Sequence, residues 1–152
     1  MHGVIGGKYA LWELVPALIE KTGSKIDDLL IATLSFSKAN AAEMLGLLDD
    51  GQVKRVGLLI SYYFKSTSRP IYDCLVPQLR ERGQRVLAMR THFKIILVKM
   101  AGGMKYVIES SADLRSSGNI EQFVMTRCPD LYGFHESWLA DELLNGTEAG
   151  EP

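Results

Sequence analysis

The segment HFKIILVKMAGGMKYVIESSADLRSSGNIE, residues 92–121, decides the fold of this chain. Two apolar runs, 93–98 and 104–109, flank the sequence MAGG, and paired glycines are typical of a tight turn between antiparallel strands. A long polar loop follows, and residues 121–126 have the composition of another short strand. We therefore expect a β-hairpin whose second strand leads into a polar loop.

His92 and Lys94 stand one residue apart at the start of the first apolar run. Successive side chains of a strand point to opposite faces, so an extended backbone places both cations on one face and Phe93 on the other. The pair is costly to bury but suits an anionic ligand: the imidazole can attack or shuttle a proton, and the ammonium can neutralise phosphate charge. By itself this spacing is weak evidence, because His-x-Lys often occurs by chance.

Outside this segment, strand-like and helix-like stretches alternate. Apolar runs with polar ends predict further strands at 29–36, 55–61 and 84–89. Apolar residues at helical spacing predict helices at 11–21, after Ser37, at 71–83 and after Pro129, with a polar loop at 62–70. The alternation predicts an α/β fold, an αβα sandwich around a mixed, mostly parallel sheet. Trp12 and Trp138 are assigned to the core, and His135 is expected to be a packing histidine rather than a catalytic one.

The residues after the hairpin make the His-x-Lys spacing specific. Ser111 and Asp113 begin the polar loop, and Asn119-x-Glu121 closes it. In this order the chain resembles the phospholipase D superfamily, whose pattern is His-x-Lys, four residues, Asp, then Gly-Ser-x-Asn and a downstream Asn/Glu pair. The expected order of strands and helices from 28 to 144 fits as well, so the resemblance covers most of the chain.

The resemblance implies a phosphodiesterase of the small nuclease-like branch that needs no metal or other cofactor. A histidine would attack phosphorus to form a phosphohistidine, and a second histidine would protonate the leaving group. His92 would be the nucleophile or the general acid, Lys94 and Ser111 would contact the phosphate, and Glu121 would orient an imidazole. Because the chain carries one motif, the complete site implies a homodimer, with DNA or RNA as the possible phosphodiester substrate.

Three positions depart from the family pattern. Lys99 stands where the family has Asp, Ser110 where it has Gly, and Asp113 where it has Asn. An Asn amide can donate to a phosphate oxygen, whereas an ionised Asp only accepts and repels the phosphate. Asp113 is therefore protonated, or paired with Lys94 or Arg115, or part of a site that binds and cuts poorly; the residues leave these alternatives open.

Aromatic and basic residues occur together between Tyr62 and Arg69, after a predicted buried strand. This composition suits the backbone and bases of nucleic acid, and a solvated connection between strand and helix is equally compatible with it. The candidate phosphate or nucleic-acid contacts are Lys65, Arg69, Arg115 and Asn119. Four other arginines fit a solvated helix end and strand rim, or a groove for phosphates, namely Arg80, Arg82, Arg85 and Arg90.

The whole chain bounds these interpretations. With 17 Lys and Arg against 18 Asp and Glu, attraction for a polyanion must come from local clustering. Two distant cysteines predict a reduced protein, with Cys74 buried. The first residues lack the features of a leader, and no apolar run reaches the ~18 residues of a spanning helix, so we expect a cytoplasmic protein without membrane insertion. Residues 1–144 are expected to form one domain and 145–152 a flexible tail.

The rival interpretation belongs to a different functional class. A phosphate- or nucleic-acid-binding scaffold could keep the fold and lose catalysis through Asp113 and Lys99. A fold by itself does not choose between an enzyme and a binding protein.

Overall fold

The computed structural model describes residues 1–148. Its strands are β1 (His2–Ile5), β2 (Ile26–Thr33), β3 (Val53–Ser61), β4 (Arg85–Met89), β5 (Ile95–Met100), β6 (Lys105–Ser110) and β7 (Glu121–Thr126). Its helices are the short 3-10 helix η1 (Leu11–Glu13), α1 (Leu14–Thr22), α2 (Lys38–Asp49), α3 (Tyr62–Thr67), α4 (Arg69–Glu81) and α5 (Pro129–Asn145). None of the helices within residues 1–148 combines the length and the apolar character needed to cross a membrane.

The strands of residues 1–148 form one sheet in the order β1-β7-β6-β5-β2-β3-β4. β2, β3 and β4 pair in parallel, whereas the other neighbours are antiparallel. The sheet is mixed, as expected, but parallel pairing is confined to one half of it and does not dominate. The expected hairpin is β5–β6, and its turn uses Gly103 at a φ of +82°, a conformation that glycine adopts without a steric penalty.

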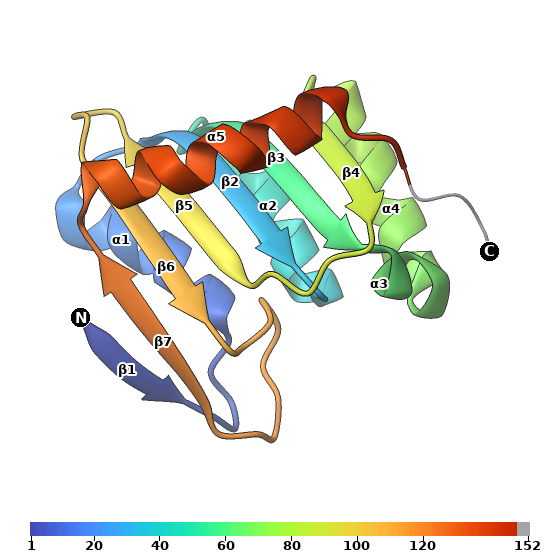
Figure 1. Ribbon diagram of the computed structural model, residues 1–152, viewed down its shortest axis with the longest axis horizontal. Helices are drawn as coiled ribbons and strands as arrows, with labels where there is room; N and C mark the ends of the chain where they lie inside the picture. Colours follow the sequence, from blue (N-terminus) through green and yellow to red (C-terminus); the bar gives the residue numbers. More distant parts are fainter. Residues whose placement is uncertain (149–152) are drawn as a thin grey trace.

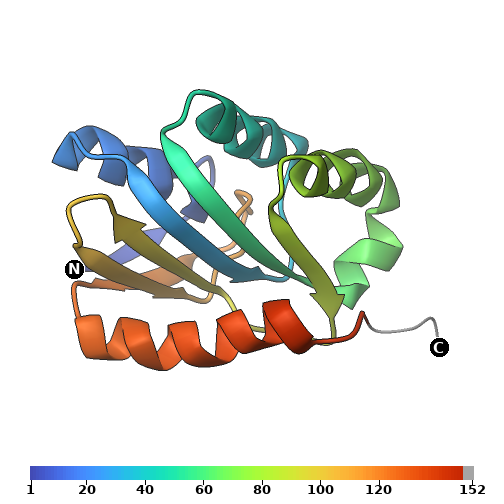
Figure 2. The ribbon, with the colours of Figure 1, turned by 90° about the horizontal axis from the view of Figure 1, so that it is seen from above.

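Helices cover both faces of the sheet, which confirms the αβα sandwich (Figures 1 and 2). α1, α2 and α4 pack on one face over a core that includes Trp12, Ile31 and Ile96. α5 crosses the other face, where its Tyr132 packs in a cluster with Leu59 and Leu97. Gly57 permits the close approach of α5, because a Cβ at this position would lie 2.7 Å from Leu143 Cδ1.

Some expectations from the sequence are wrong in detail. The segment 62–70, expected to be a loop, contains α3, because Ser61 caps it by accepting from the Tyr63 N–H at 3.3 Å and Phe64 is buried against Phe36. Cys74 is exposed, not buried. Its neighbour Leu75 is buried on α4, but adjacent helical residues lie about 100° apart and need not share a face.

Lys99 belongs to an ion-pair cluster at the end of β5 that is remote from His92. Its Nζ lies 3.7 Å from Asp28 Oδ2, and Arg55 also donates to the Asp28 carboxylate. The three residues are cross-strand neighbours on β5, β2 and β3. At about 3.3 Å per residue, Lys99 lies roughly 16 Å along the strand from Lys94. The departure at Lys99 therefore does not alter the immediate surroundings of His92.

Asp28→Asn should lower the free energy of unfolding at neutral pH by about 1–3 kcal/mol, because charge-assisted hydrogen bonds contribute about that much. The hydrogen bond from Arg55, with smaller effects of Arg55 and Lys99 charge, lowers the pKa of Asp28 below its usual 3.8. A lowered folded-state pKa stabilises above the unfolded-state value, and this contribution is lost as the pH falls through the folded-state pKa. Urea unfolding followed by tryptophan fluorescence should therefore separate wild type from Asp28→Asn at pH 7 and show convergence well below pH 3.8. Asp27→Asn is the matched control, and equal loss in both variants would contradict the prediction.

Candidate active site

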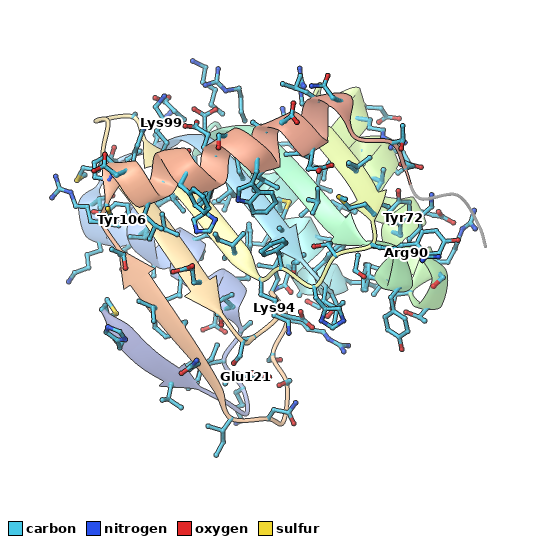
Figure 3. The ribbon with its side chains drawn as sticks, viewed as in Figure 1. Tyr72, Arg90, Lys94, Lys99, Tyr106 and Glu121 are labelled. Carbon is cyan, nitrogen blue, oxygen red and sulfur yellow. The ribbon has the colours of Figure 1, made fainter. Side chains whose placement is uncertain are left out.

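The strand directions bring the sequence motifs to one edge of the sheet. β2, β3, β4 and β6 end at this edge and β5 and β7 begin there. We call it the site edge; the strand residues that bound it are Thr33, Ser61, Met89, Ile95, Ser110 and Glu121. Figure 3 shows Lys94 and Glu121 at this edge and Lys99 at the opposite one.

His92 and Lys94 lie in the segment before β5, not within the strand as expected. The pairing with β6 nevertheless continues one residue beyond β5, because the carbonyl of Lys94 accepts from the Ser110 N–H at 3.1 Å. Phe93 packs on Trp138 of α5, with ring centroids 4.7 Å apart. The alternation expected from the sequence therefore holds for Phe93, which faces α5 with Ile95 and Leu97.

Ser111 is held between β6 and the start of β7. Its hydroxyl donates to Glu121 Oε2 and accepts from the Gln122 N–H at 3.1 Å, and its own N–H donates to the Gln122 carbonyl at 3.1 Å. A phosphate at this point would compete with Glu121 for the Ser111 proton. Ser111 and Glu121, ten positions apart in the sequence, thus form one hydrogen-bonded unit at the site edge.

The carboxylate of Asp113 forms one hydrogen bond, with a residue that lies just after β2, and its second oxygen is buried. Its Oδ2 accepts from Ser35 Oγ at 2.8 Å, while its Oδ1 is buried with no hydrogen-bond partner among the described residues. Within residues 1–148, neither Lys94 nor Arg115 forms a hydrogen bond with it, although Arg115 lines the same pocket of about 150 Å³. The partner is thus Ser35, which sequence reasoning missed. The rule that ligand-binding groups follow the carboxyl ends of parallel strands could have pointed to it.

His92 lines a larger, open pocket of about 870 Å³ on the β4 side of the site edge. Its other lining residues are Leu34, Ser61, Tyr62, Tyr63, Ser66, Arg90 and Thr91. Tyr63 is 66% exposed, and both Leu34 and Tyr63 also line the Asp113 pocket. In residues 1–148 the lining of this larger pocket includes neither Lys94 nor Ser111. His92 therefore lies between the pocket on one side and the segments that carry Lys94 and Ser111 on the other.

The other candidate contacts are dispersed. Lys65 Nζ binds Glu148 at 3.0 Å, and Arg69 forms an exposed i,i+4 ion pair with Asp73. Asn119 is exposed, and a Cβ on Gly6 would lie 3.1 Å from its backbone carbonyl, which places this residue beside the end of β1. Among the four arginines that the sequence assigned either to a solvated surface or to a groove for phosphates, Arg90 lines the His92 pocket.

His135 is a packing residue, as expected. It is 8% exposed on α5, its Nδ1 accepts from Trp138 Nε1 at 3.2 Å, and its Nε2 lies 3.5 Å from Glu109 Oε1. Within residues 1–148, His, Cys, Asp and Glu side chains form no group of three that could hold a metal ion.

No protein-family model and no curated protein matches the sequence. Solved structures do match. Nuc, a phospholipase D family member from Salmonella typhimurium, superposes with a TM-score of 0.66 and 16% identity over 99% of this chain and 100% of Nuc. NucT from Helicobacter pylori gives a TM-score of 0.60 and 13% identity, with 99% of each chain covered.

A third similar structure is TrmBL2, an archaeal chromatin protein with a novel mode of DNA binding. It matches 98% of this chain with a TM-score of 0.60 and 14% identity, and this chain spans 55% of its length. These likenesses, together with the αβα layers and the strand order described above, show the architecture that the sequence motifs implied. The protein adopts the fold of the phospholipase D superfamily.

Proposed function

We propose that the protein is a phosphodiesterase that cleaves nucleic acid through a phosphohistidine, in a site that two copies of the chain share. The observation that supports this best is the meeting, at the site edge, of the chain segments that carry His92, Lys94, Ser111 and Glu121. The resemblance of the fold to Nuc and NucT agrees with phosphodiester chemistry.

In the proposed reaction, a ring nitrogen of His92 attacks phosphorus and the bond from phosphorus to the leaving oxygen breaks. The imidazolium of the second His92 gives its proton to that oxygen. Water then attacks the phosphohistidine, the second imidazole takes the water proton, and His92 is released. Lys94 would neutralise developing charge on the phosphoryl oxygens, and Ser111 would donate to them after turning from Glu121.

The second histidine would come from a partner copy. The sequence contains three histidines, and His135 is engaged by Trp138 on the face that α5 covers. His2 belongs to β1, at the far end of the strand order from β4. A twofold axis near the site edge would bring the partner's His92 to the same phosphate.

Nucleic acid is the proposed substrate because of the pocket beside His92. Base stacking on exposed aromatic side chains is favourable for every base, and an arginine adds attraction for the backbone. Tyr63 and Arg90 supply these groups in the pocket that His92 lines. The DNA binding of TrmBL2, on a similar fold, is compatible with this choice.

The test is cleavage in EDTA of single- and double-stranded DNA and RNA and of bis(p-nitrophenyl) phosphate. We expect turnover of the polynucleotides and of the chromogenic diester. Binding of DNA or RNA without turnover of any of these substrates would support the scaffold function instead. Failure both to bind and to cut would rule out both functions.

Asp113→Asn should raise cleavage or phosphate affinity about tenfold, because it removes a negative charge near the proposed phosphate position. The oxygen of the new amide could still accept from Ser35 Oγ. Its nitrogen would take the place of Oδ1, which has no hydrogen-bond partner within residues 1–148, and would supply an N–H donor there. The measurement is kcat/KM on the chromogenic diester, with Asp50→Asn as a charge-matched control. Asp50 is exposed and precedes β3, at the opposite edge of the sheet. An equal gain in the control would mean that net charge, not the local donor, is responsible.

A further inference from the structure

Three residues beyond the end of α5, Glu148 is bound by a cluster of donors from α3 and α4. Its Oε2 accepts from Lys65 Nζ at 3.0 Å, and its Oε1 accepts from Arg80 Nη2 at 2.7 Å and from the Tyr72 hydroxyl at 3.3 Å. We call Lys65, Tyr72 and Arg80 the Glu148 cluster. The expected tail 145–152 thus includes a residue with specific contacts, and residues 149–152 lie outside the described part of the chain.

The Glu148 cluster has the chemistry of a phosphate site. Two cations and a hydroxyl surround one carboxylate, and the same donors bind phosphate oxygens. Tyr72 is 6% exposed, and burial followed by the charge of Glu148 raises its pKa to about 12, so its hydroxyl remains a donor at neutral pH. Without Glu148, the cluster would present two positive charges.

The position of the cluster relates it to the pocket beside His92. Lys65 lies on α3, the helix that also carries Tyr62, Tyr63 and Ser66 of that pocket. Figure 3 shows Tyr72 and Arg90 at the end of the molecule formed by β4, α3 and α4. A strand of nucleic acid that crosses the His92 pocket over α3 would reach the cluster.

We propose that the Glu148 cluster is a second phosphate-binding site for the nucleic-acid backbone, and that Glu148 occupies it in the free protein and competes with the substrate. This inference rests on the proposed function, because it takes nucleic acid as the ligand. The competition is reversible, because the side chains of Glu148 and Arg80 are 37% and 52% exposed and ion pairs of that exposure are weak. A short tether nevertheless keeps the carboxylate at a high effective concentration.

The experiment measures binding of a fluorescent single-stranded oligonucleotide in EDTA by anisotropy, at several salt concentrations. Glu148→Gln should tighten binding about three- to tenfold at low salt. One additional phosphate contact should steepen the slope of log K against log salt by about 0.7. Lys65→Ala combined with Glu148→Gln should lose the gain.

Glu136→Gln is the matched control, because the Glu136 side chain is also 37% exposed and lies 3.9 Å from Lys105 in its own ion pair. It should change affinity less than about twofold. An equal gain in both variants, an unchanged affinity of Glu148→Gln, or no binding by any variant would overturn the inference. Tighter binding by Glu148→Gln without cleavage by wild type would support the inference and reject the phosphodiesterase.

Discussion

His92→Ala should reduce phosphodiester cleavage in EDTA by at least about 10³-fold, because the substitution removes both the nucleophile and the general acid of the proposed shared site. His135 is not positioned to take these roles, because it is held by Trp138 on the α5 face. The measurement is single-turnover cleavage of a labelled oligonucleotide, with the phosphohistidine trapped by denaturing the protein at alkaline pH and detected on a gel. Loss of both cleavage and the trapped intermediate is the expected result.

The fold of the variant should be intact, because the His92 side chain is exposed. Exposed substitutions of this kind usually change stability by less than about 0.5 kcal/mol. His2→Ala, which removes the exposed histidine of β1, is the matched control and should cleave like wild type. Cleavage by His92→Ala at a rate within tenfold of wild type would exclude the phosphohistidine route.

The sequence predicted the local elements around the site well, because their signals are local. Residues 121–126 coincide with β7, Ser37 caps α2 by accepting from the Asn40 N–H, and the hairpin follows from its apolar runs and turn glycines. The expected order of strands and helices then brings segments from distant parts of the chain to one edge. The direction of each strand decides which of its ends lies at the site edge, so the residues that precede or follow the strands can be assigned to that edge once the directions are known.

What the sequence could not predict depends on contacts between distant residues. The hydrogen bond from Ser35 to Asp113 joins positions 78 apart, and the contact of Lys65 with Glu148 joins positions 83 apart. β1 was missed because a four-residue strand at the terminus has little pattern of its own and is fixed by pairing with β7. α3 was missed because aromatic and hydroxyl residues have low helix propensity, which the burial of Phe64 overrides.

These distant contacts change the interpretation of individual residues more than that of the fold. Lys65 was expected to bind phosphate directly, but its ammonium is engaged by Glu148. For Asp113 the sequence left open protonation, pairing with Lys94 or Arg115, or a site that binds and cuts poorly; the structure adds a hydrogen bond from Ser35, which lies just after β2, to one carboxylate oxygen. The departures from the family pattern therefore have different consequences: Lys99 is remote from His92, whereas Asp113 lines a pocket to which Tyr63 also contributes.

Mixed dimers should lose cleavage of DNA by at least about 100-fold, because one His92 cannot both attack phosphorus and protonate the leaving oxygen. Wild type and His92→Ala carrying different affinity tags would be co-expressed, and the dimers with both tags isolated. If each subunit worked alone, these dimers would keep half of the wild-type activity. Mixed dimers of wild type with His2→Ala should keep full activity and control for the tags and the purification.

The chromogenic diester makes this test sharper, because p-nitrophenolate leaves without needing a proton. In the mixed dimer, the one remaining His92 should still attack bis(p-nitrophenyl) phosphate, while hydrolysis of the phosphohistidine lacks the second imidazole as base. We therefore expect a burst of about one p-nitrophenolate per mixed dimer followed by slow turnover, as accumulation of a covalent intermediate requires. Light scattering must show dimers under the same conditions. A protein that stays monomeric at micromolar concentration and still cleaves DNA would rule out a shared site, because the general acid that protonates the leaving oxygen would then belong to the same chain as the attacking His92.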